Sequence, residues 1–198
     1  MVHRYRRDVP IVREYAEEMM AFGGKHDLPV HRAKAMVFLG WAIAEEGELE
    51  QGLALVREGL EVQKAIDTRE DFPVFFEILA GMYARTGRGD LALGLLAEIL
   101  EETERTGLCY WTPELYRVRG EVLLSRMRGA EDEAEGWIRK ALDLAREQQV
   151  KSLELRAAMS LARLETRRGG TDRTQALLAL VYAWFGEGLN TVDLVEAR

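Results

Sequence analysis

Three arginines near the end of the chain have the type and spacing to bind anions. Arg156, Arg163 and Arg167 lie seven and four residues apart (163 − 156 and 167 − 163), so they share one helical face. The planar guanidinium group forms paired hydrogen bonds with carboxylates and phosphates. The set therefore favours a site for an acidic peptide or domain. The alternative is a solvated face whose charge is balanced by Glu154 and Glu165.

No other residues form a pattern typical of catalysis, cofactor binding or metal binding. The sequence has no Gly-x-x-x-x-Gly-Lys-Ser/Thr segment, the loop that binds ATP phosphates. His26 and His31 do not share a helical face, and no cysteine or second carboxylate joins them. Cys109 has no candidate histidine partner near it in the sequence. We therefore expect no catalytic, cofactor or metal residues, and a chain that is not an enzyme.

Composition limits the class of partner. The chain has 198 residues, a net charge of −7 and 31 % charged residues. A basic excess, typical of proteins that bind nucleic acids or membrane surfaces, is missing. No apolar run is long enough to span a bilayer. A single cysteine excludes an internal disulfide and is typical of a reducing compartment. We expect a cytoplasmic protein that binds neither membranes nor nucleic acid directly.

The sequence repeats itself with a period of about 40 residues, each time as two amphipathic stretches. Residues 43–47 are echoed by residues 83–87 (87 − 47 = 40). This pattern indicates stacked helical hairpins and an all-α fold. Glycine in a helix costs about 1 kcal/mol relative to alanine, so its recurrence predicts close helix–helix contacts. Small residues recur at one register position, namely Gly40, Ala80, Gly120 and Ala162.

We predict a single helical-repeat domain over residues 1–198. A half-repeat occupies residues 1–28, in which Tyr15, Ala16, Met19 and Met20 indicate the second helix of an incomplete repeat. Prolines at the start of first helices and glycines in the turns support the boundaries. The predicted hairpins are 29–70, 71–110, 111–150 and 151–186, and residues 187–198 start a further helix.

The order of small and large residues in Leu39, Gly40 and Ile43, followed by Gly52, Val56 and Gly59, resembles the tetratricopeptide repeat. The usual repeat has about 34 residues, so the period here is longer. The resemblance implies a right-handed superhelix (α-solenoid) whose concave wall consists of the first helix of each hairpin. For Trp41, the sequence leaves open an aromatic anchor for a partner or a core residue. Transferring the register gives ten residues, which we call the wall residues: Lys34, Trp41, Glu45, Glu77, Arg85, Arg117, Glu121, Arg156, Arg163 and Arg167.

A second resemblance covers nearly the whole chain. Residues 114–121, 151–158 and 177–185 resemble the C-terminal repeat region of large bacterial signalling proteins with a cyclase-like or DNA-binding N-terminus and a central ATPase. The resemblance implies a non-catalytic interaction and regulatory module of an ATP-dependent signalling or transcription-regulating protein. Its partner would be a peptide or protein domain on the concave face, such as the ATPase domain of its own parent chain.

Two further interpretations stay open at this point. The same concave wall could instead belong to a small-molecule (inducer) sensing domain. The apolar residues Trp184 and Phe185 near the last glycines also leave a homodimer open, because an exposed apolar end favours association.

Overall fold

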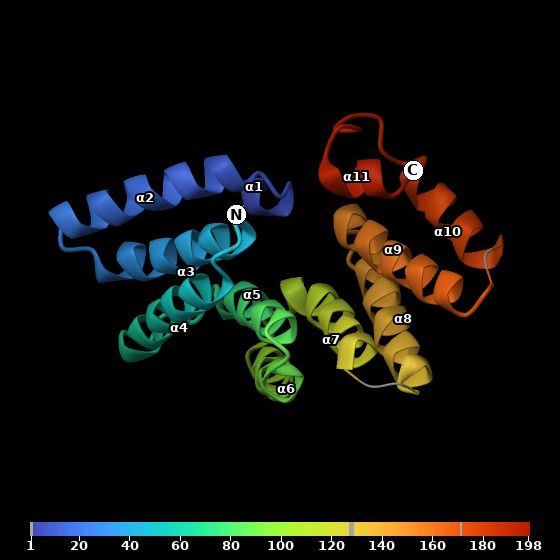
Figure 1. Ribbon diagram of the computed structural model, residues 1–198, viewed down its shortest axis with the longest axis horizontal. Helices are drawn as coiled ribbons and strands as arrows, with labels where there is room; N and C mark the ends of the chain where they lie inside the picture. Colours follow the sequence, from blue (N-terminus) through green and yellow to red (C-terminus); the bar gives the residue numbers. More distant parts are fainter. Residues whose placement is uncertain (1, 127–128, 171) are drawn as a thin grey trace. The chain divides into compact units, whose positions relative to one another are not determined.

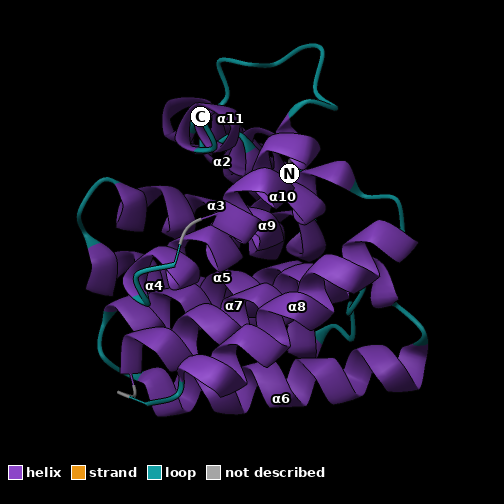
Figure 2. Ribbon diagram, turned by 90° about the vertical axis from the view of Figure 1, so that its right-hand side faces the viewer, coloured by secondary structure: helices purple, strands orange, loops and turns teal. Residues whose placement is uncertain are grey.

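The computed structural model describes residues 2–126, 129–170 and 172–198. Every regular element in these residues is a helix, and they contain no strand (Figure 2). The helices belong to two compact units, residues 1–91 (unit 1) and residues 92–198 (unit 2), which are described separately. The all-α class built from helical hairpins is confirmed. A single domain over the whole chain stays a prediction.

Unit 1 is a series of antiparallel helices joined by short turns. Its helices are α1 (Val2–Tyr5), α2 (Val9–Lys25), α3 (Pro29–Glu45), α4 (Leu49–Ala65) and α5 (Phe72–Arg85). Proline occupies one of the first two positions of α2, α3 and α5, where no intrahelical N–H bond is lost. Gly47 turns the chain from α3 into α4 with φ of +109°. As successive neighbours in Figure 1, α2 packs on α3 and α3 on α4.

The helix expected around Tyr15, Ala16, Met19 and Met20 is α2, and one face of it is buried. Val12, Ala16 and Gly23 are buried, whereas Tyr15 keeps 53 % of its surface exposed. Met19 and Met20 are half-buried. The stripe that meets α3 follows the small residues 16 and 23, seven residues apart, and Tyr15 lies about 100° away from Ala16 around the helix.

Unit 2 continues the alternation of first and second helices. α6 (Gly89–Thr106) leads into it, and a short 3-10 turn, η1 (Cys109–Trp111), precedes α7 (Thr112–Arg126). Then follow α8 (Glu131–Glu147), α9 (Lys151–Arg167), α10 (Asp172–Tyr182) and α11 (Val192–Glu196). α8 packs on α7, α9 on α8, and α10 on α9 (Figure 1). Ile138, Leu155, Leu161 and Val181 form part of the core between them, together with Leu194 of α11.

The glycines at the recurring small-residue position lie at close helix crossings, as predicted. A Cβ atom on Gly40 would stand 2.6 Å from the backbone oxygen of Gly52 on α4, and one on Gly120 would stand 2.6 Å from Ile138 on α8. Real Cβ atoms essentially never approach that closely. The close approach of paired helices is therefore the reason for glycine at both positions.

A buried carboxylate joins α8 to α9 and makes stability depend on pH. Glu154 accepts hydrogen bonds from Arg146 (2.9 Å) and Lys151 (2.6 Å). Burial raises the pKa of Glu154, but Lys151 and Arg146 outweigh it, so this pKa lies below its ordinary value of 4.5. A lowered pKa stabilises the fold above the unfolded-state value, and the contribution is lost as the pH falls through the folded-state pKa.

We therefore expect the free energy of unfolding of Glu154→Gln to depend less on pH in the acidic range than that of the native chain. The free energy of unfolding of the native chain should fall more steeply than that of the variant between about pH 5 and pH 3. Urea unfolding followed by circular dichroism at several pH values measures both slopes. Parallel curves for the two proteins would contradict the assignment.

Candidate functional site: the first-helix wall and the α9–α10 groove

Three of the wall residues of unit 1 join α3 to α5. The ammonium group of Lys34 lies 2.5 Å from Asp71 and 3.2 Å from Glu70. Burial lowers the pKa of Lys34, but the two carboxylates outweigh burial and raise it. At the other end of the helices, Arg85 contacts Glu45 at 2.5 Å and donates to the backbone oxygen of Ala44 at 3.0 Å. Lys34, Glu45 and Arg85 therefore hold successive first helices together.

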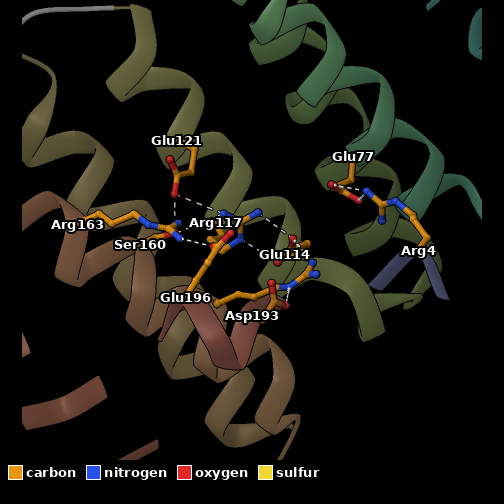
Figure 3. Close-up of polar contacts among 10 residues, drawn as sticks. Arg4, Glu77, Glu114, Arg117, Glu121, Ser160, Arg163, Asp193 and Glu196 are labelled. Atoms are coloured by element: carbon orange, nitrogen blue, oxygen red, sulfur yellow. Dashed lines mark hydrogen bonds and ion pairs between the residues drawn. The ribbon is translucent and has the colours of Figure 1, made fainter. Parts of the chain in front are cut away.

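The two remaining wall residues of unit 1 are buried under α1. Glu77 is 7 % exposed and accepts a hydrogen bond of 2.9 Å from Arg4. Trp41 is 8 % exposed, and the Arg4 guanidinium carbon lies 5.8 Å from its ring centroid. Figure 3 shows Arg4 and Glu77 facing each other. Trp41 thus has the burial of a core residue, the second of the two interpretations open from the sequence.

In unit 2, a buried carboxylate forms the centre of a polar cluster between first helices. Glu114 of α7 is 1 % exposed and accepts two hydrogen bonds from Arg117, at 2.9 and 3.0 Å. Arg156 of α9 donates to Glu114 at 3.1 Å and to Asp193 of α11 at 2.7 Å. The chain of contacts Arg117–Glu114–Arg156–Asp193 therefore connects α7, α9 and α11. Figure 3 labels Arg117, Glu114 and Asp193 of this cluster.

The next turn of α9 carries a parallel set of contacts. Ser160 donates to Glu121 of α7 at 2.6 Å and accepts from Arg117 at 3.3 Å. Arg163 donates to Glu196 of α11 at 2.8 Å, and both side chains remain partly exposed. Arg167 is exposed and makes no ion pair with any side chain that the structure describes.

One ion pair recurs at equivalent repeat positions. Asp71 follows Lys34 by 37 residues (71 − 34), and Asp193 follows Arg156 by 37 residues (193 − 156). In each pair a cation on one first helix contacts an aspartate at the start of the next. α11 therefore meets α9 in the register in which α5 meets α3.

An open groove lies beside the arginines of α9. It has a volume of about 780 Å³ and runs between α9 and α10 up to the end of α11. Met159, Ala162, Leu178 and Ala179 supply apolar surface. Polar side chains of the groove include Arg163, Thr166, Arg167, Gln175 and Tyr182. Among the wall residues, Arg163 and Arg167 are the two that line it.

Sequence reasoning missed the partners of the wall residues. Arg4, Asp71, Glu114, Asp193 and Glu196 were not among the candidates. For two of them a signal was available, because Asp71 and Asp193 occupy the same repeat position 37 residues after a cation. No group of three or more His, Cys, Asp or Glu side chains in the described part of the chain is arranged to hold a metal ion. Among the described helices, none is both long enough and apolar enough to cross a membrane.

Comparison with solved structures decides the fold. Two crystal structures of a kinesin light chain-like protein of Podosopora anserina, with nearly identical TPR-like repeats, match 91 % of this chain. Their TM-scores are 0.61 and 0.60, at 19 % and 18 % identity, and 89 % and 90 % of those chains are covered. The chain has a tetratricopeptide-like fold.

Sequence comparison adds one relative. No family model matches the chain. An uncharacterized protein of Rhizobium meliloti (strain 1021) is 28 % identical over 160 residues, which are 81 % of this chain and 16 % of that protein. The tetratricopeptide-like array thus spans less than a fifth of the length of the curated relative that it matches.

Proposed function

We propose that the chain is a non-catalytic protein-interaction and regulatory module that binds a peptide or protein domain along its first helices. Tetratricopeptide-like arrays present extended surfaces to partners. The observation that carries the proposal is the α9–α10 groove, where Arg163 and Arg167 stand next to apolar surface. The other wall residues already contact other parts of the chain. Arg163 contacts Glu196 but keeps 49 % of its side chain exposed, so we infer that the partner surface concentrates on α9 and α10.

We place this module in a larger, ATP-dependent signalling or transcription-regulating protein of bacteria. The matched segment is 16 % of the bacterial relative, which supports a role as one part of a long chain. In such a protein the ATPase domain of the same chain is a natural partner. Binding would change the activity of the parent if the partner prefers one of its conformational states.

Quantitative co-purification tests the interaction function. The tagged chain is expressed in its source cells next to the double variant Arg163→Glu/Arg167→Glu. A control variant, Lys25→Glu/Arg57→Glu, makes the same charge change at exposed positions of α2 and α4. We expect a partner that co-purifies with the native chain and the control but is depleted with the arginine variant. A chain that purifies alone in all three forms would contradict the function.

A second candidate function is small-molecule sensing in the same groove. A volume of about 780 Å³ falls in the range of drug-sized ligand sites, and apolar surface with a few polar groups is typical of them. Thermal unfolding in the presence of a panel of amphipathic carboxylates separates the two functions. A raised melting temperature that Arg167→Glu abolishes would favour the sensor.

A further inference from the structure

Two positive charges lie against the ring of Trp137 on α8. The guanidinium carbon of Arg119, on α7, lies 4.2 Å from the ring centroid, and the ammonium nitrogen of Lys140, on α8, lies 4.4 Å from it. The negative face of an aromatic ring attracts such cations. Tyr116 of α7 packs against the same ring at 5.4 Å, so Trp137 is held by contacts from both helices of the hairpin. We call Arg119, Trp137 and Lys140 the cation–tryptophan cluster.

Within the described residues, neither cation of this cluster has an anionic partner. Arg119 and Lys140 make no ion pair there, whereas the neighbouring Arg139 is paired with Glu135 at 2.5 Å. The Nε atom of Arg119 is shielded from solvent, and no described residue accepts a hydrogen bond from it. Both cations lie within 4.4 Å of one ring centroid, so one short anionic segment can contact both. Carboxylates there would accept the missing hydrogen bonds and neutralise both charges.

The space beside the cluster is open. Lys140 is exposed, and Gly136 precedes it by about one helical turn on the same face of α8. A Cβ atom on Gly136 would meet no atom within 4 Å. Unlike Gly40 and Gly120, Gly136 is therefore not required by a helix crossing among the described residues. A ligand can approach α8 at this position without a side chain in its way.

The surroundings of the cluster limit the size of the anion. Exposed acidic residues lie on either side of it along α8. Glu133 precedes Trp137 by one turn, and Asp143 and Glu147 follow Lys140 by one and two turns. These carboxylates repel a long polyanion, such as a nucleic acid or an anionic membrane surface. A short segment with one or two carboxylates reaches the cations without meeting them.

We propose that the cation–tryptophan cluster binds a short acidic segment of a protein partner, whose carboxylates contact Arg119 and Lys140. The half-buried Trp137 adds aromatic surface of the kind that is enriched at protein interfaces. The cluster lies outside the wall residues and outside the α9–α10 groove. It is therefore a second interaction surface, beyond the one in the proposed function.

Anisotropy of a labelled acidic peptide tests this site. The probe is a fluorescein-labelled peptide of six glutamates, titrated with the complete 198-residue chain. Lys140→Gln removes one charge of the cluster at an exposed position. Arg139→Gln is the matched control, because it removes the same charge at the neighbouring residue, which is already paired with Glu135. We expect Lys140→Gln to weaken binding by about fivefold or more, and Arg139→Gln to leave it within about twofold.

Two other labelled probes test the class of ligand. A peptide of six glutamines keeps the length and removes the charge, and an oligonucleotide of six thymidylates replaces carboxylates by phosphates. We expect both to bind at least about fivefold more weakly than the glutamate peptide. Binding of the oligonucleotide as tight as that of the glutamate peptide would replace the protein partner by a nucleic acid. Equal binding of the glutamine peptide would show that the cluster does not select acidic segments.

The remaining outcomes also overturn the proposal. Unchanged binding to Lys140→Gln would place the peptide elsewhere on the chain. Equal weakening by Lys140→Gln and Arg139→Gln would reduce the effect to the general charge of α8. A glutamate peptide that does not bind the native chain at concentrations up to about 1 mM would exclude the site. None of these measurements changes Arg163 or Arg167, so the co-purification test of the proposed function stays independent of them.

Discussion

Replacing Glu114 with alanine is expected to lower the free energy of unfolding by about 3–5 kcal/mol, because it removes the buried carboxylate that two arginines share. Glu114 is 1 % exposed and accepts hydrogen bonds from both Arg117 and Arg156. Arg156 is itself only 10 % exposed. Removal of the carboxylate leaves Arg156 with Asp193 and Arg117 with Glu121, and the hydrogen bonds that both arginines lose lie inside unit 2, shielded from water. Urea unfolding of the native chain and the variant at neutral pH measures the difference.

Two further variants show whether the stability lost in Glu114→Ala comes from the buried charge. One keeps the size of the side chain, and the other removes a charge at the surface. Glu114→Gln keeps the size of the side chain and one acceptor oxygen, so it should lose less stability than Glu114→Ala. Glu196→Gln removes the partly exposed partner of Arg163 and should cost less than about 1 kcal/mol, as exposed ion pairs do. If Glu114→Ala cost no more than Glu196→Gln, the cluster around Glu114 would not stabilise unit 2.

The hairpins could be predicted from the sequence because their signals are local. Proline at the start of a helix and glycine in a turn act within a few residues, and the structure starts α3 at Pro29 and turns at Gly47 as expected. The glycines Gly40 and Gly120 predicted where paired helices come into close contact. Glycine lowers the stability of a helix, so its presence there indicates that close packing offsets the loss. α1 was not predicted, since four residues are too few to show a period.

The partners of the wall residues could not be predicted in the same way. Spacing shows that Arg156, Arg163 and Arg167 share a helical face, but it does not show what that face meets. The outcome depends on residues 183–191, which lead the chain from α10 back to α9 and bring Asp193 and Glu196 to two of the arginines. Arg4 and Glu77 are likewise 73 residues apart in the sequence, and no repeat pattern links the two positions. Pairing of this kind is a property of tertiary structure.

Replacing Gly40 with alanine is expected to destabilise unit 1 by about 2 kcal/mol, even though alanine is the better helix former. The new Cβ would stand 2.6 Å from the backbone oxygen of Gly52 and 2.8 Å from a methyl group of Val56. A backbone oxygen cannot rotate away as a flexible side chain can, so α3 and α4 must separate. Separation loosens the packing along the whole hairpin, and its cost exceeds the gain of about 1 kcal/mol in helix propensity.

Gly81 on α5 provides the matched control within the same unit. A Cβ on Gly81 would meet no atom within 4 Å, so Gly81→Ala should gain the helix propensity without a clash and stabilise the chain by up to about 1 kcal/mol. The same Gly→Ala change is therefore expected to have opposite effects on the free energy of unfolding at the two helical glycines. Urea unfolding of both variants measures these effects. Stabilisation by Gly40→Ala would mean that α3 and α4 lie further apart than the structure has them. Destabilisation by both variants would contradict the open space around Gly81.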